Sequence, residues 1–251
     1  MRQVFPESRD VDDELSIYDG LAFPDPPDDR PYVFMNMVTS ADGKAQIGSR
    51  AAGLGSELDR GLMLRLRALA DAVIQGAGTA RQERIYRKLP QPLRNQRLER
   101  GQSPEPLMAI MSGSLDLPLD SAVFRLQSPG PVVFCADRSP AEQVRRLQQV
   151  SNVVVSGQLR PNVGDVVQAL RRDFGVRHLL CEGGPTLNRT FFDAGLVDEL
   201  FLTFAPKVVA GEAKTVVEGQ QFSPGEQPNL QLLTIYEKDS ELFLRYRVVG
   251  H

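Results

Sequence analysis

Short apolar runs alternate with amphipathic segments along most of the chain, and this alternation predicts the fold class. The apolar runs that predict strands lie at residues 32–39, 71–76, 107–111, 132–135, 153–155, 176–181 and 199–205. Helical spacing or helix-boundary residues mark residues 56–70, 80–87, 140–150, 163–174 and 185–194. Repeated strand–helix units of this kind predict an α/β fold with a mostly parallel central sheet flanked by helices.

The two ends of the chain depart from this alternation. Residues 230–237 and 241–249 have strand patterns and face each other across a short polar turn, which predicts an antiparallel C-terminal strand pair. Residues 1–30 are acidic and end in a proline-rich stretch, so they are predicted to form an N-terminal extended arm. The remaining residues, 31–251, are predicted to form one domain, with a polar, arginine-rich loop at 91–106.

Composition narrows the possible partners and chemistry. Lys and Arg number 29 against 32 Asp and Glu, a formal charge of −3, which argues against nucleic acid and anionic membrane surfaces as partners. No apolar run approaches the ~20 residues of a membrane span, and the polar N-terminus is unlike a signal peptide, so a cytoplasmic protein is expected. Cys135 and Cys181 lie in apolar runs, which predicts buried thiols in a reducing compartment. Two cysteines and two histidines (His178 and His251) are too few for a Cys/His zinc site, so no metal is expected.

The clearest candidate for chemistry is the turn EGGPT at 182–186, between a predicted strand and a predicted helix. Glycine lets a phosphate approach the backbone, the helix N-terminus favours an anion, and Thr186 adds a hydroxyl donor. An ordinary tight turn is the alternative that this segment by itself leaves open. A second glycine turn, GAGT at 76–79, also leads from a strand towards a helix, but it is too short for a Rossmann fingerprint.

Polar residues also interrupt and end the first central strand. Asn36 is embedded in the apolar run, and an unpaired buried amide costs about 1–3 kcal/mol, so its partner is predicted to be a neighbouring loop or a ligand. The run ends in the turn SADGK at 40–44. Asp42 in this turn can project into the cleft at the end of the sheet, where α/β proteins bind ligands. A solvated turn aspartate is the alternative.

Three segments converge on one family: Asn36 with SADGK at 40–44, GAGT at 76–79, and EGGPTL at 182–187. In this order and spacing they resemble the pyrimidine reductase of riboflavin biosynthesis, the C-terminal domain of the bifunctional deaminase–reductase, here in a stand-alone form. The resemblance covers roughly residues 30–211. It implies the dihydrofolate-reductase-like fold, NADPH as cofactor, and reduction of a ribosylaminopyrimidine 5′-phosphate to its ribitylamino form by hydride transfer to C1 of the open sugar.

The resemblance also implies roles for the residues at matching positions. Asp42 and Glu182 would be the catalytic carboxylates, orienting polar groups of the substrate or relaying a proton. The substrate-binding residues would be Asn36, Ser40 and Arg60, with Arg60 meeting the sugar phosphate. The cofactor-binding residues would be Gly76, Gly78, Thr79, Glu83, Gly183, Gly184, Thr186 and Leu187.

Two other functions stay open at this stage. One keeps the fold and cofactor but reduces a pterin such as dihydrofolate, although Asn36, Asp42 and Glu182 suit a phosphorylated pyrimidine better. The other is a non-catalytic nucleotide-binding relative, which the altered loop QERIY at 82–86 motivates. For a pyrimidine reductase, the substrate is either the aminouracil or the undeaminated diaminopyrimidinone. Family members pair through sheet edges, so a homodimer is expected.

Overall fold

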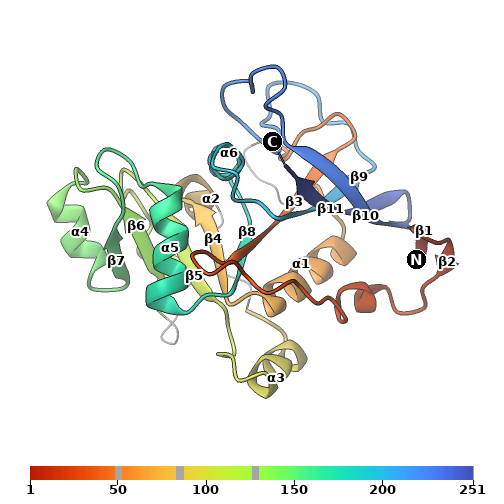
Figure 1. Ribbon diagram of the computed structural model, residues 1–251, viewed down its shortest axis with the longest axis horizontal. Coiled ribbons are helices and arrows are strands. Elements are labelled where there is room, and N and C mark those ends of the chain that lie inside the picture. The colour runs from red at the N-terminus through yellow and green to blue at the C-terminus, as the bar shows by residue number, and fades with distance from the viewer. Residues whose placement is uncertain (49–52, 83–87, 126–129, 251) are drawn as a thin grey trace. The chain divides into compact units, whose positions relative to one another are not determined.

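The computed structural model describes residues 1–48, 53–82, 88–125 and 130–250, and the chain divides into two compact units. The first unit contains Met1–Phe23, Val33–Leu66 and Pro185–His251, and the second contains Pro24–Tyr32 and Arg67–Gly184. Figure 1 shows the strands and helices of both in chain order. The expected boundary between an arm at 1–30 and a domain at 31–251 stays a prediction.

The second unit is a parallel sheet whose strands alternate with helices along the chain. Its strands are paired in the order β8-β4-β5-β6-β7, and every pair is parallel. The strands are β4 (Ala72–Gly76), β5 (Leu107–Met111), β6 (Val132–Cys135), β7 (Asn152–Val155) and β8 (His178–Cys181). The helices are α2 (Ala77–Gln82), α3 (Gln91–Glu99), η2 (Ala122–Arg125), α4 (Ala141–Leu147) and α5 (Val163–Phe174).

The first unit is built around a mostly antiparallel sheet. Its strands are β1 (Arg2–Phe5), β2 (Arg9–Asp10), β3 (Tyr32–Ser40), β9 (Glu199–Ala205), β10 (Asn229–Lys238) and β11 (Glu241–Val249). They are paired in the order β2-β1-β10-β11-β9-β3, in which only β3 and β9 are parallel. The helices are η1 (Glu14–Tyr18), most of α1 (Glu57–Leu69), and α6 (Pro185–Asp193). The predicted α/β fold, with parallel strands and an antiparallel C-terminal pair, is therefore confirmed.

Local chemistry explains several of the element boundaries. The Ser56 hydroxyl accepts a hydrogen bond from the Asp59 N–H at 3.1 Å, so Ser56 is the predicted N-cap of α1. Gly175 ends α5 with a left-handed φ of 66°. Asp239 and Ser240 have φ values of 51° and 67°, and the expected hairpin between β10 and β11 closes through these two residues, because Lys238 already pairs with Glu241. Both cysteines are buried free thiols, as predicted.

The N-terminal segment contributes more than an extended arm. Its first residues form β1, which pairs with the edge strand β10. Tyr18 is buried and packs edge-to-face on Phe201 with ring centroids 5.3 Å apart, and Phe23 stacks on Phe34 at 4.4 Å. These aromatic contacts attach residues 1–23 to the core of the first unit.

The interpretation of residues 91–106 as a loop is wrong for the first part of this range, because Gln91–Glu99 form helix α3. The segment is polar, and its helical pattern rests on Leu93 and Arg97, which are one turn apart and both buried. Arg97 is only 1 % exposed because its guanidinium donates to backbone carbonyls at the end of α1. An analysis of hydrophobic periodicity does not detect a buried arginine of this kind.

None of the helices in the described ranges is long and apolar enough to cross a membrane.

Candidate functional site

The two glycine turns of the second unit lie side by side at the carboxyl ends of two neighbouring parallel strands. Strand β4 ends at Gly76 and β8 ends at Cys181, so their following turns meet at one sheet edge. The Gly76 N–H donates to the Gly183 carbonyl at 2.8 Å. The structure thus brings together the predicted cofactor residues Gly76, Gly78, Thr79, Gly183 and Gly184, at the edge where α/β sheets bind ligands.

Two of these positions need glycine for different reasons. Gly183 has a φ of 80°, in the left-handed region that side chains disfavour. At Gly184, an added Cβ would lie only 3.1 Å from the Thr79 Oγ1 atom. At Gly78, by contrast, a Cβ would meet no described atom within 4 Å, so the backbone there borders open space. The turns therefore offer a narrow, side-chain-free approach to the backbone, which suits a phosphate group.

Glu182, a predicted catalytic carboxylate, is held by an arginine to which the sequence analysis assigned no role. Arg67, in the last turn of α1, donates from Nε to Oε1 at 2.5 Å and from Nη2 to Oε2 at 2.7 Å. Both side chains are nearly buried, at 6 % exposed for Arg67 and 9 % for Glu182. Arg67 stands within the segment LRA at 66–68, two residues after Arg65, so its charge alone did not distinguish it in the sequence.

Asp42 and Ser40 come together in the first unit, in the turn that follows β3. The Ser40 hydroxyl donates to Asp42 Oδ1 at 2.6 Å and accepts from the Lys44 N–H at 2.9 Å. The backbone N–H groups of Val209 and Ala210 donate to the two carboxylate oxygens of Asp42 at 3.0 and 2.7 Å. The Ser40 hydroxyl and these N–H groups lower the pKa of Asp42 to about 2. A carboxyl with this pKa stays ionised near neutral pH, which favours a positioning role over a proton relay.

The other predicted substrate residues differ in how far the protein satisfies them. Asn36 is half-buried on β3, and its amide makes no hydrogen bond with the protein within the described ranges. The bond to a neighbouring loop is therefore not seen among the described residues, and the contact to a ligand stays a prediction. Arg60 is paired with Glu57 one turn earlier and donates to the Gly55 carbonyl at 3.3 Å. No described hydrogen bond or ion pair joins Arg60 to Asn36, Ser40 or Asp42.

The remaining cofactor residues divide between solvent and core. Thr186 is exposed in the first turn of α6, whereas the Leu187 side chain is buried. Beside them, the fully buried Asn188 donates from Nδ2 to the Val216 carbonyl at 2.8 Å, a contact for which the local sequence carried no signal. The one predicted cofactor residue not yet placed, Glu83, lies outside the described residues.

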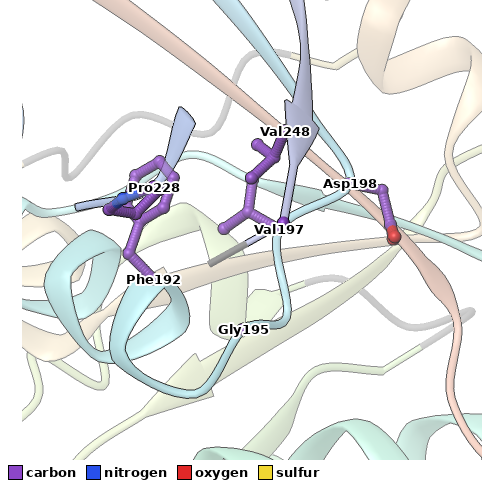
Figure 2. A pocket seen from close by; sticks show the side chains of 7 residues that line it. Phe192, Gly195, Val197, Asp198, Pro228 and Val248 are labelled. Atoms are coloured by element: carbon purple, nitrogen blue, oxygen red, sulfur yellow. The ribbon is translucent and has the colours of Figure 1, made fainter. Parts of the chain in front are cut away.

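A pocket of about 160 Å³ lies elsewhere in the first unit, and no predicted site residue lines it (Figure 2). Its lining residues are Phe192, Gly195, Val197, Asp198, Pro228, Val248 and Gly250. The Asp198 carboxylate accepts the Val33 N–H at 2.7 Å, so it serves to hold the start of β3. Asp198 is the only ionisable residue among these lining residues, so the pocket offers no chemistry comparable to that of the glycine turns.

Comparison with known proteins gives a consistent assignment. The family model described as the RibD C-terminal domain matches residues 31–244. A 2,5-diamino-6-ribosylamino-4(3H)-pyrimidinone 5′-phosphate reductase of Archaeoglobus fulgidus is 34 % identical over 197 residues, which cover 77 % of this chain and 89 % of that protein. The reductase of the same name from Methanothermobacter thermautotrophicus is 28 % identical over 223 residues, covering 88 % of this chain and all of that protein.

A solved structure agrees with the sequence comparisons. The crystal structure of a pyrimidine reductase-like protein from Corynebacterium diphtheriae matches with a TM-score of 0.81 and 26 % identity, over 95 % of this chain and 99 % of that one. The predicted resemblance to the pyrimidine reductases of riboflavin biosynthesis and to their dihydrofolate-reductase-like fold is thereby confirmed. From its sequence and its fold, this chain belongs to the RibD C-terminal domain family.

Proposed function

We propose that this protein is a stand-alone NADPH-dependent reductase of riboflavin biosynthesis, which converts a ribosylaminopyrimidine 5′-phosphate to its ribitylamino form. Its relatives from Archaeoglobus and Methanothermobacter bear the name of such a reductase and align with this chain over most of their length. The observation that carries the proposal is the pair of glycine turns at adjacent strand ends. They provide the phosphate-accepting backbone that a nicotinamide dinucleotide requires.

The residues of the second unit fit such a cofactor. Gly78 borders open space, and a Cβ added at Gly184 would lie in tight contact with the Thr79 hydroxyl, at 3.1 Å. Gly78, Thr79, Gly183 and Gly184 would hold the dinucleotide through backbone N–H groups and the Thr79 hydroxyl. Gly76, whose N–H donates to the Gly183 carbonyl, would hold the two turns together beside it. When bound, NADPH supplies the hydride for the reduction.

The chain's own polar groups would bind and orient the substrate. In the first unit, the Asn36 amide is available to a ligand, and the ionised Asp42 carboxylate is fixed in place by three hydrogen-bond donors. In the second unit, Glu182 presents a carboxylate whose direction Arg67 determines. Fixed acceptors of this kind accelerate a reaction by holding hydroxyls and amines in one geometry. The roles of these residues stay predictions.

The names of the relatives favour the undeaminated diaminopyrimidinone over the aminouracil as substrate. A preference for NADPH over NADH needs a cation near the 2′-phosphate, and Arg81 and Arg138 are the two candidates for this cation. The Arg81 side chain already donates to the Asp116 carbonyl at 2.9 Å. Arg138 follows the end of β6, and its backbone N–H donates to the Gln158 carbonyl at 3.1 Å. Glutamine variants of both, assayed with NADPH and NADH, would identify the residue that sets the preference.

The decisive experiment measures loss of the nicotinamide absorbance band with each of three substrates: the diaminopyrimidinone phosphate, the aminouracil phosphate and dihydrofolate. We expect turnover with the first. Turnover with dihydrofolate alone would make the protein a pterin reductase. Tight NADPH binding without turnover on any of them would make it a non-catalytic relative.

Binding of NADPH has its own readout, because a ligand of the native state alone stabilises by RT ln(1 + [L]/Kd), about 2.7 kcal/mol at one hundred times Kd. An unchanged melting temperature at millimolar NADPH would contradict the proposal. The expected homodimer is tested by sedimentation velocity. The cytoplasmic location that we propose rests on the two buried free thiols, which fit a reducing compartment.

A further inference from the structure

Two buried arginine–glutamate pairs of the same geometry occur in the chain. One joins Arg67 to Glu182, and the other joins Arg245 on β11 to Glu199 on β9, at 2.7 Å from Nε and 2.9 Å from Nη2. In both pairs the contact between arginine and carboxylate is bidentate, and both glutamate side chains are almost completely buried. A buried ion pair is weak evidence for stability, because desolvation offsets the attraction. The location of each pair therefore indicates what it does.

The Arg245–Glu199 pair lies within a regular sheet, between strands that already share a ladder of backbone hydrogen bonds. The Arg67–Glu182 pair lies where two elements end. Arg67 is in the last turn of α1, and Glu182 is the residue between the last residue of β8 and the two glycines. Within the described residues, the hydrogen bonds of the Glu182 carboxylate come from Arg67, so Arg67 is what fixes its direction.

The arginine side of the pair is itself held rigidly. The Arg97 guanidinium donates to the carbonyls of Ala68 and Ala70 at 3.0 and 2.5 Å, and its Nε donates to the Ser103 carbonyl at 2.8 Å. Arg100 adds a bond to the Ala68 carbonyl at 2.8 Å. Cations that bind the last carbonyls of a helix stabilise that end. The backbone from which Arg67 projects is therefore fixed by α3.

The glutamate side of the pair is continuous with the glycine turn. The Glu182 N–H donates to the Ile74 carbonyl at 3.0 Å, and the next carbonyl, of Gly183, accepts from Gly76 at 2.8 Å. A carboxylate offers about four lone-pair sites, and the Arg67 fork occupies two of them. The remaining lone pairs keep a defined direction relative to the turn.

We propose that Arg67 is a positioning residue for the reduction: its guanidinium holds the Glu182 carboxylate in one orientation, as an acceptor for a hydroxyl or amine of the substrate. This inference rests on the proposed function. It separates Arg67 from the cofactor, which would meet the backbone of the glycine turns. Loss of the fork should accordingly lower kcat and leave the affinity for NADPH nearly unchanged.

The test compares Arg67→Lys with its matched control Arg245→Lys. Lysine keeps the charge of each pair and removes the two-pronged geometry. We expect Arg67→Lys to lower kcat by about tenfold or more with the KM for NADPH within about threefold of wild type. Both variants should lower the melting temperature by similar amounts. The kcat of Arg245→Lys, however, should stay within about threefold of wild type.

A second pair of variants keeps the test independent of how well lysine fits. The activity of Arg67→Ala should rise by about tenfold when methylguanidinium is added, and that of Arg245→Ala should not. Equal losses of kcat in the two lysine variants, or wild-type kcat in Arg67→Lys, would overturn the proposal and leave the pair a structural one. Absence of pyrimidine reduction by the wild-type protein would instead overturn the proposed function, and this inference with it.

Discussion

Replacing Asp59 with asparagine should stabilise the protein at alkaline pH and leave it nearly unchanged at acid pH. Asp59 lies in the first turn of α1, against Thr203 and near the buried Glu241. Its carboxylate packs so tightly on the chain that a Cβ at Gly55 would come within 2.1 Å of Oδ2. Burial, with the negative charge of Glu241, raises the pKa of Asp59 from 3.8 to about 6.

The magnitude follows from this shift. A shift of about two pKa units at 1.36 kcal/mol each amounts to about 2.7 kcal/mol. Because the pKa is raised on folding, the folded state binds the proton more tightly than the unfolded chain. The stabilisation by the neutral carboxyl is therefore complete below about pH 4 and is lost as the pH rises through about 6. Asparagine stays neutral throughout and avoids this loss.

The assay is thermal unfolding of wild type and Asp59→Asn between about pH 4 and pH 8. The gap between the two melting temperatures should grow from near zero to about 5 °C, at roughly 2 °C per kcal/mol for a chain of this length. Glu57→Gln is the control, since the Glu57 side chain is 88 % exposed and its pairing with Arg60 is worth less than about 1 kcal/mol. A gap that is constant over this pH range, or a variant less stable than wild type at pH 8, would refute the reasoning.

Three further predictions address the proposed site and its support. Asp42→Asn should lower single-turnover rates by roughly 100-fold and leave NADPH titrations nearly intact, so unchanged rates would remove Asp42 from the reaction. Gly184→Val should weaken NADPH binding far more than Gly164→Val. Gly164 is a matched control, because an added Cβ lies 3.1 Å from a side-chain oxygen at both positions. Unfolding of the Gly184 variant alone would show that this glycine is structural. Arg97→Met should lower the free energy of unfolding in urea by about 3–5 kcal/mol, because it removes the side-chain donors of the Ala70 and Ser103 carbonyls, whereas the exposed Arg100→Met should cost about 1 kcal/mol. Equal losses of unfolding free energy in the two variants would mean that burial of Arg97 contributes nothing to stability.

The sequence by itself determined the elements whose signals are local. Strands β5, β6 and β9 and helix α5 begin and end where the apolar runs and capping residues predict. These boundaries depend on side-chain periodicity and on Gly175, which are properties of neighbouring residues. The three motif segments likewise predicted the family, because several independent stretches agreed in order and spacing.

Only the tertiary structure decided which polar groups meet. Helix α3 escaped prediction because the carbonyls that bury Arg97 come from the end of α1, about 27 residues away. The two backbone N–H groups that donate to Asp42 lie 167 and 168 residues further along the chain, and Arg67 and Glu182 are separated by 115 residues. A hydrogen bond leaves no periodic trace in the sequence, since either partner can be satisfied by any suitably placed group. The fold is therefore readable from local patterns, while the orientation of its charged side chains depends on contacts that only the folded chain creates.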